Sequence, residues 1–182
     1  MTMNRFNEEE RGQPPDDVHC VLLKTAMQLT TNGSEAETVL QQCADYFRNK
    51  RLLQTHAASC GLNLVNESIS ECMQIYFEVQ AEGAIKGFIS CGWDEPGFRV
   101  GQVVMVPIEH MPELQLHAQE IMQLLARNGI AITTDPDDEQ AVHYLNLTIN
   151  IPDAGFNAAT LSQAVWTMNA CVELIKKTIP CK

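Results

Sequence analysis

The C-terminal part of the chain constrains the fold most, because a strand pattern is followed there directly by a helix pattern. Between Leu145 and Ile151 apolar residues alternate with polar ones, which predicts a strand with one buried face. Asn157 then offers a helix N-cap, and apolar residues follow it at alternating steps of four and three. These apolar residues are Leu161, Val165, Met168, Val172, Ile175 and Ile179. Each pattern leaves an apolar side to be covered, so together they predict helices packed on a sheet.

Alternation also marks a group of strands in the middle of the chain. Residues 73–79 alternate apolar and polar side chains, and a Glu-Gly turn leads to a second strand over 85–91. The turn Asp94–Gly97 leads to a third strand over 98–106. Because the connections are short, the three strands are expected to form an antiparallel meander. Residues 62–65 fit either a short strand or a linker.

Two further helices follow from the spacing of apolar residues. Ser34 and Glu37 form a capping-box pattern at the start of a helix whose apolar positions continue to Phe47. Pro112 stands where a first helical residue belongs, and the pattern after it runs to Asn128 and the following glycine. Each of these helices has enough apolar positions to pack on the sheet.

A strand over 130–134 and a polar loop over 135–139 complete the pattern. The sequence therefore predicts an α+β fold with a five-stranded antiparallel sheet packed with helices. The expected order is helix, three strands, helix, two strands, helix, with an extra helix over 17–31. Residues 1–16 are polar and charged and are expected to be a disordered arm, so residues 17–182 are expected to form a single domain.

The charge of the chain restricts its partners. The formal net charge is −11, and the twelve lysines and arginines form no long block. Nucleic acids and anionic membranes reward clustered cations, so neither is expected as a partner. An acidic surface serves solubility, or suits a basic or unfolded protein partner.

The compartment is expected to be the cytoplasm. The N-terminus has no apolar segment of the kind found in signal peptides, and no run of the chain approaches the length of a membrane span. Seven cysteines occur without tight pairing, and we expect reduced thiols that mostly behave as small apolar side chains.

The element order from Ser34 onward resembles that of bacterial type III secretion chaperones and of the YbjN-like family of sensory transduction regulators. The segment 144–153 (YLNLTINIPD), followed by an amphipathic helix, also fits that resemblance. The resemblance covers about residues 34–179, whereas the helix over 17–31 and the long stretch 62–72 depart from it. It implies a homodimer that binds a segment of a partner protein on its helix and sheet surfaces, without catalysis.

One group of side chains has the composition of a metal site. Glu113, His117 and Glu120, with His110 nearby, stand at helical spacings that can gather carboxylates and imidazoles on one side. The ordinary interpretation is a solvated helix face in which Glu113 and His117 form a mild pair. The alternative is a small metal-dependent or ligand-binding regulatory protein that uses this cluster.

The remaining catalytic patterns are weak. His19 beside Cys20 and His56 near Cys60 are sequence neighbours, but catalytic Cys and His usually meet through the fold. The acidic residues over 135–139 lack the glycine and distant glutamate of a calcium loop. We therefore expect no catalytic residue, no metal and no cofactor.

The sequence thus predicts a non-enzymatic protein-binding module, similar to a chaperone or an adaptor, that acts as a homodimer or with another protein. Trp93 beside a turn is a candidate partner contact, because exposed aromatic residues anchor protein interfaces. Met111, Leu116 and Met122 are candidate contacts on the helix after Pro112, although core packing would explain each of them equally well.

Overall fold

A computed structural model describes residues 36–69, 75–81, 84–91, 97–137 and 139–179. The chain separates into two compact units, residues 1–47 and 48–182. Of the first unit, the described part is helical, and the Gln41 side chain donates a hydrogen bond to Asp45 there (Nε2–Oδ1 3.1 Å). The expected arm over 1–16 and helix over 17–31 lie outside the described residues, so the single domain over 17–182 stays a prediction.

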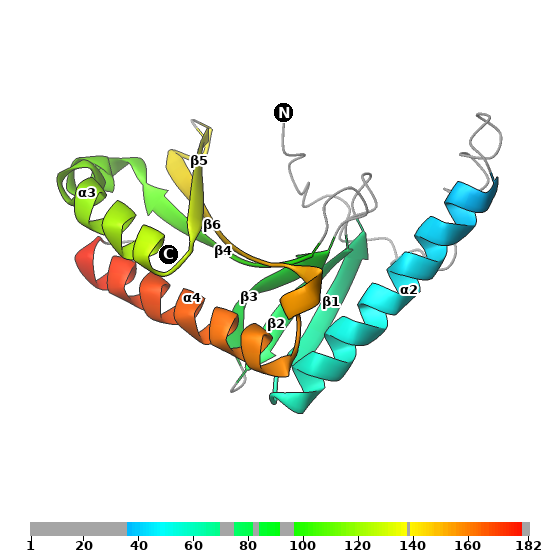
Figure 1. Cartoon of the computed structure of the whole chain (residues 1–182). Helices are drawn as coiled ribbons and strands as arrows, with labels where there is room; N and C mark the ends of the chain where they lie inside the picture. Colours follow the sequence, from blue (N-terminus) through cyan, green and yellow to red (C-terminus); the bar gives the residue numbers. More distant parts are fainter. Residues whose placement is uncertain (1–35, 70–74, 82–83, 92–96, 138, 180–182) are drawn as a thin grey trace. The chain divides into compact units, whose positions relative to one another are not determined.

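Six antiparallel strands form one sheet in the order β1-β2-β3-β4-β6-β5 (Figure 1). The strands are β1 (Asn63–Ile69), β2 (Ile75–Ala81), β3 (Ala84–Cys91), β4 (Phe98–Pro107), β5 (Ala131–Asp137) and β6 (Val142–Ile151). The expected α+β class and the antiparallel meander are confirmed. The expected count of five strands is wrong, because the sheet has a sixth.

The additional strand is β1, which contains most of the stretch that fitted either a strand or a linker. Its pairing with β2 shifts register between Val65 and Ser68, and Asn66 has a positive φ of 52°. A bulge of this kind breaks the two-residue period, and polar side chains are common on edge strands. This is why alternation did not reveal β1.

The expected loop over 135–139 is also partly wrong, because β5 continues through Asp137. Pro136 is compatible with this edge strand because, among the described residues, β5 pairs with β6 alone. The Asp137 carboxylate then accepts hydrogen bonds from the backbone N–H groups of Glu139 and Gln140, both at 3.1 Å. These bonds stabilise the turn into β6.

Helices α3 (Met111–Arg127) and α4 (Ala158–Thr178) lie side by side against the sheet (Figure 1). A short 3-10 helix, η2 (Ile108–His110), precedes α3, and another, η3 (Asp153–Gly155), precedes α4. Because β4 and β5 both run antiparallel to β6, α3 is a crossover between two parallel strands with β6 between them. The core between the helices and the sheet contains Val104, Val106, Ile121, Leu125, Leu145, Leu147, Met168, Val172 and Ile175.

Helix α4 follows its sequence pattern closely. Asn157 is the N-cap: its side chain accepts from the N–H groups of Ala159 and Thr160, and Thr160 Oγ1 accepts from the N–H of Asn157. All six apolar residues of the predicted stripe are at most 1% exposed. The apolar stripe therefore belongs to the buried core, as expected of an apolar helix side that packs on a sheet.

The part of α2 (Ala36–Ser59) within the second unit is tied to the sheet by a charged pair. Lys50 Nζ lies 2.8 and 2.7 Å from the two carboxylate oxygens of Glu67 on β1. Leu53 and Ala57 of the same helix are buried. The ring of His56 contacts that of Phe156 edge-on, and Phe156 stacks on Phe98 with ring centroids 3.6 Å apart.

Candidate partner-binding surface

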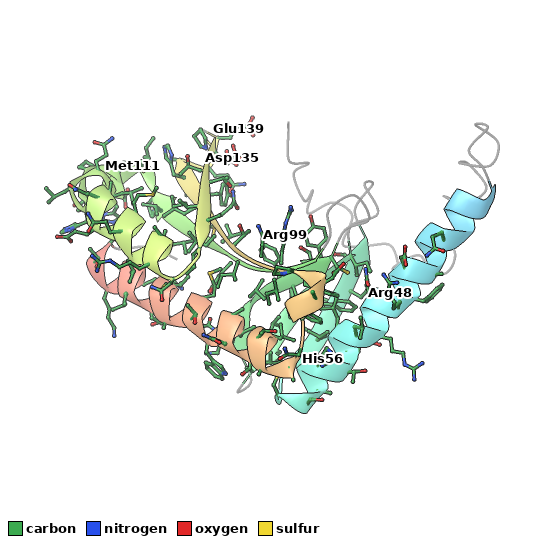
Figure 2. All side chains as sticks on the ribbon, in the orientation of Figure 1. Arg48, His56, Arg99, Met111, Asp135 and Glu139 are labelled. Atoms are coloured by element: carbon green, nitrogen blue, oxygen red, sulfur yellow. The ribbon has the colours of Figure 1, made fainter. Side chains whose placement is uncertain are left out.

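The predicted contact residues of α3 do not form one patch. Ile121 and Leu125 mark the buried side of α3. Leu116 is 78% exposed and Met122 is 52% exposed, but six residues at 3.6 per turn place them about 120° apart around the helix. Met111, at the start of α3 (Figure 2), is partly buried against the core. It therefore contributes to packing.

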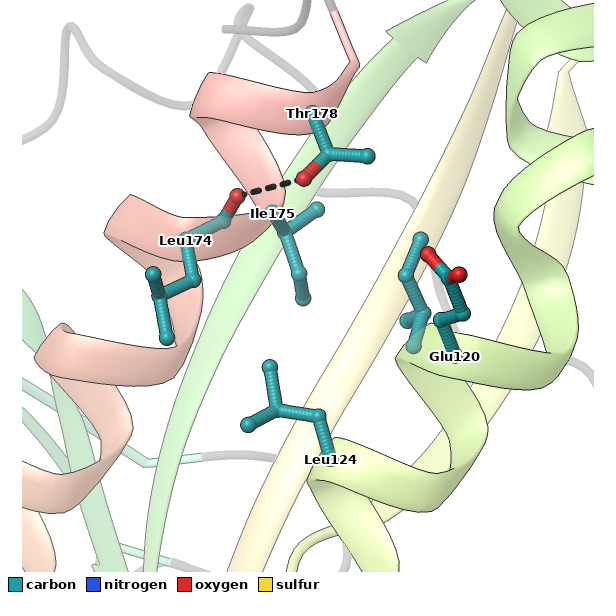
Figure 3. Close-up of a pocket in the computed structure, with 6 residues that line it drawn as sticks. Glu120, Leu124, Leu174, Ile175 and Thr178 are labelled. Carbon is teal, nitrogen blue, oxygen red and sulfur yellow. Dashed lines mark hydrogen bonds between the residues drawn. The ribbon is translucent and has the colours of Figure 1, made fainter.

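A groove lies between α3 and α4 (Figure 3). It encloses about 220 Å³ and is lined by Glu120, Ile121, Leu124, Leu174, Ile175 and Thr178. Ile121 and Ile175 are buried, whereas Leu174 is 48% exposed. The groove thus presents apolar side chains to solvent.

The polar groups of the groove are engaged. Thr178 Oγ1 donates to the carbonyl oxygen of Leu174 at 3.0 Å. Glu120 Oε2 lies 3.3 Å from His117 Nδ1 on the same helix. Drug-sized ligands are usually held in pockets of roughly 300–1,000 Å³, so the size of this groove suits a single apolar side chain better.

Further apolar residues of α4 continue the surface from Leu174 toward the start of the helix. Trp166, Ala170 and Leu174 stand four residues apart and therefore share one side of the helix, and the Trp166 side chain is 44% exposed. On α3, Leu116, Glu120 and Leu124 share a side in the same way. These two rows, which we call the helical surface, are Leu116, Glu120, Leu124, Trp166, Ala170 and Leu174.

Sequence reasoning found Leu116 but missed Trp166 and Leu174. Both residues fall outside the four-and-three stripe that predicted the buried side of α4. The sequence did contain a signal for them. The side of a surface helix opposite its buried stripe is normally polar, so large apolar residues there indicate a contact surface.

The candidate metal cluster does not assemble. His117 turns toward Glu120, whereas His110 Nδ1 lies 3.8 Å from Glu113 Oε2. Within the described residues, no group of three or more His, Cys, Asp or Glu side chains is placed to hold a metal ion. These residues form separate pairs on the surface of α3.

His56 and Cys60 do not form a catalytic pair either. Cys60 Sγ donates to the backbone oxygen of His56 at 3.1 Å, while the His56 ring contacts Phe156. Burial raises the pKa of the Cys60 thiol, which disfavours the reactive thiolate. His19, Cys20 and the candidate contact Trp93 lie outside the described residues.

Burial also makes Cys91 unreactive. Its side chain is 2% exposed, and burial, together with the negative charge of Asp153, raises the pKa of the thiol to about 12. Cys171 is likewise buried, and burial raises its pKa. Both thiols therefore behave as small apolar side chains.

No helix in the described part of the chain is both long and apolar enough to cross a membrane. Neither a model of a known protein family nor a curated protein matches the chain. The chain is similar in fold to the crystal structure of an uncharacterized protein from Methanothermobacter thermautotrophicus, with a TM-score of 0.57 and 14% sequence identity. The similarity covers 71% of this chain and 95% of that one, and it establishes the fold alone.

Proposed function

We propose that the chain is a non-enzymatic protein-binding module, similar to a chaperone or an adaptor. The observation that carries the proposal is the apolar groove of the helical surface, with Leu124 and Leu174 at its walls. Exposed apolar side chains beside a small apolar hollow are typical of protein interfaces. The proposed occupant is an apolar side chain from a partially unfolded partner protein.

The negative charge agrees with this role. A net charge of −11 keeps the chain in solution and favours partners with basic segments. The resemblance to secretion chaperones and YbjN-like proteins adds that the module works as a homodimer, and we place it in the bacterial cytoplasm.

Binding of a permanently unfolded protein tests the proposal. Reduced and alkylated lysozyme, a basic protein, is labelled with a fluorophore and titrated with the full chain, and anisotropy gives the affinity. We expect micromolar binding that Leu174→Lys weakens at least tenfold, because a hydrated ammonium would replace the apolar surface that Leu174 offers to the side chain of the partner. Gln123→Lys on the exposed side of α3 adds the same charge outside the groove and should change binding less than twofold.

Sedimentation of the same samples at micromolar concentration measures the oligomeric state. A dimer is expected. A monomer that binds no unfolded protein would contradict the proposal.

A further inference from the structure

The end of α3 carries an asparagine followed by a glycine. Asn128 is the C-cap of the helix and is exposed to solvent, and Gly129 follows it. An asparagine side chain can lose its amide spontaneously, by reaction with the backbone nitrogen of the next residue. Glycine shields that nitrogen least because it has no side chain, so this pair is a candidate site of chemical modification.

The reaction has two steps and consumes only water. The backbone nitrogen of Gly129 gives up its proton and bonds to Cγ of Asn128, while the bond from Cγ to Nδ2 breaks and Nδ2 leaves as ammonia with that proton. Water then opens the cyclic imide at one of its two carbonyl groups. The product is aspartate or isoaspartate, and isoaspartate has one additional methylene group in the backbone.

The backbone conformation of Asn128 prevents the first step. Its ψ is 8°, so the Gly129 nitrogen nearly eclipses the backbone nitrogen of Asn128. The five-membered imide requires the Gly129 nitrogen on the side of the Asn128 Cβ, which is another corner of the tetrahedral Cα. The ring therefore closes only after a large rotation about the Cα–C bond of Asn128.

Two backbone hydrogen bonds oppose this rotation. The Gly129 N–H donates to the Ala126 carbonyl oxygen at 3.2 Å, and the Ile130 N–H donates to that of Leu125 at 2.9 Å. Together with the φ of 67° at Gly129, they form the Schellman motif of a helix C-terminus. Ile130 is only 5% exposed, so rotation at Asn128 would also pull a core side chain out of place.

A third hydrogen bond holds the reacting side chain. Asn128 Nδ2 donates to the carbonyl oxygen of Leu124 at 2.8 Å, which directs the amide back along the helix and away from Gly129. These hydrogen bonds and the packing of Ile130 must open before the ring can close. Helix ends open locally at a lower free energy than the whole domain, so a small open population controls the rate.

The product cannot rebuild the turn. An aspartate has no donor for the Leu124 oxygen, and its negative charge would lie among the last carbonyl groups of α3, where the helix dipole disfavours anions. Arg127 is exposed, so its attraction for this charge is small in water. The methylene group of isoaspartate would displace Gly129 and Ile130 from their acceptors.

We propose that Asn128 is a site of spontaneous deamidation that the folded turn keeps closed and that local opening of the α3 C-terminus exposes. The inference goes beyond partner binding and does not depend on it. Because the loss of ammonia is irreversible, deamidated chains accumulate in proportion to the time that the turn spends open. Each conversion leaves the junction between α3 and β5 less stable.

Peptide mapping by mass spectrometry tests the inference. The full chain is incubated at pH 8 in buffer and in concentrated guanidinium chloride, and conversion at each asparagine is followed over time. Asn128 should convert at least tenfold faster in the denaturant. Asn146, which Leu147 follows, is the internal control and should convert at least tenfold more slowly than Asn128 in the denaturant.

Two results would overturn the inference. Equal rates for Asn128 in buffer and in denaturant would show that the folded turn does not control the reaction. No conversion at Asn128 in denaturant would show that the pair is not a deamidation site. The other Asn-Gly pair, Asn32–Gly33, lies outside the described residues, and the mapping distinguishes it from Asn128.

A pair of core variants separates local from global opening. Ile130→Ala removes the side chain that anchors the turn and should speed conversion in buffer at least threefold more than Met168→Ala, which removes a buried side chain of α4. In denaturant both variants should convert at the rate of the wild type, because the Asn-Gly pair is unchanged. Equal acceleration by the two variants in buffer would contradict local opening.

A second pair of variants tests the effect of the product. Asn128→Asp should lower the urea midpoint of unfolding, because it places the charge of the product at the C-terminus of α3. Gln115→Glu makes the same change from amide to carboxylate at an exposed position near the start of α3, and it should leave the midpoint unchanged. An Asn128→Asp midpoint equal to that of the wild type would contradict the destabilising effect of deamidation.

Discussion

Gly87 of β3 lies directly against the backbone of Gly101 on β4, just beyond the last pair of residues that joins the two strands. Gly87 has a φ of 130°, and a Cβ at this position would clash with the carbonyl oxygen of Gly101. Only glycine adopts this backbone conformation readily. Gly87 therefore marks the point at which the pairing of β3 with β4 ends.

The first prediction concerns this glycine. Gly87→Ala should lower the free energy of unfolding by roughly 2–4 kcal/mol, because it combines an unfavourable φ with a clash against backbone. Urea denaturation measures the change. Gly155→Ala is the matched control, since a Cβ there would meet nothing within 4 Å, and it should change stability by less than about 0.5 kcal/mol. Equal effects would contradict this account of Gly87.

The second prediction compares the loss of stability when a buried methionine and an exposed methionine are each replaced by alanine. Met168→Ala should cost about 2–5 kcal/mol, because Met168 is fully buried between α4 and the sheet. Met122→Ala should cost less than about 0.5 kcal/mol, because half of Met122 is already exposed. Thermal or urea unfolding of both variants checks the difference. A similar loss in the two would mean that Met122 belongs to the core.

The N-cap of α4 gives a third prediction. Asn157→Ala removes the acceptor of two backbone hydrogen bonds and should destabilise the protein by about 1 kcal/mol. Asn157→Asp keeps an acceptor at the helix N-terminus and should retain most of the stability. Urea unfolding midpoints distinguish the two, and an unchanged midpoint for Asn157→Ala would refute the assigned cap.

The raised pKa of Cys91 predicts that the protein loses stability at high pH. The pKa of about 12 in the folded protein lies above the ordinary thiol value of 9.0, so the unfolded chain loses this proton first as the pH rises. Stability from this group is therefore fully present below pH 9 and decreases between pH 9 and 12. By pH 10 the loss should be on the order of 1 kcal/mol.

The measurement compares urea unfolding at pH 8 and pH 10 for the wild type and for Cys91→Ala. The variant has its own cavity cost at both pH values, so the difference between the two pH values isolates the thiol. The wild type should lose more stability than the variant over this range. Identical losses would show that Cys91 does not titrate as its burial requires.

The helices and strands that could be predicted are those in which the spacing of apolar residues coincides with the spacing of buried residues. In β2 every second residue from Ile75 to Ala81 is buried, and in α4 the apolar stripe is wholly core, so both were predictable. The helix after Pro112 was also found, with Gly129 in the left-handed conformation that ends it.

Other features could not be predicted from the sequence, because contacts between distant parts of the chain determine them. The bulge at Asn66 breaks the alternation of β1, and Asp135 and Asp137 have loop composition although they lie in a strand. Leu174 is apolar and exposed because α3 lies beside it without covering it. The pairing of β4 with β3 ends at Gly101 because of the contact with Gly87, which no local pattern in β4 encodes.

The most direct test of the central claim is affinity capture of the full chain from a lysate of its source organism. Bound polypeptides are identified and quantified for the wild type, Leu174→Lys and Gln123→Lys. The account predicts a near-stoichiometric protein partner that Gln123→Lys retains and Leu174→Lys loses. Wild-type protein that emerges without a bound polypeptide, or a partner that Leu174→Lys binds equally well, would contradict a protein-binding role for the helical surface.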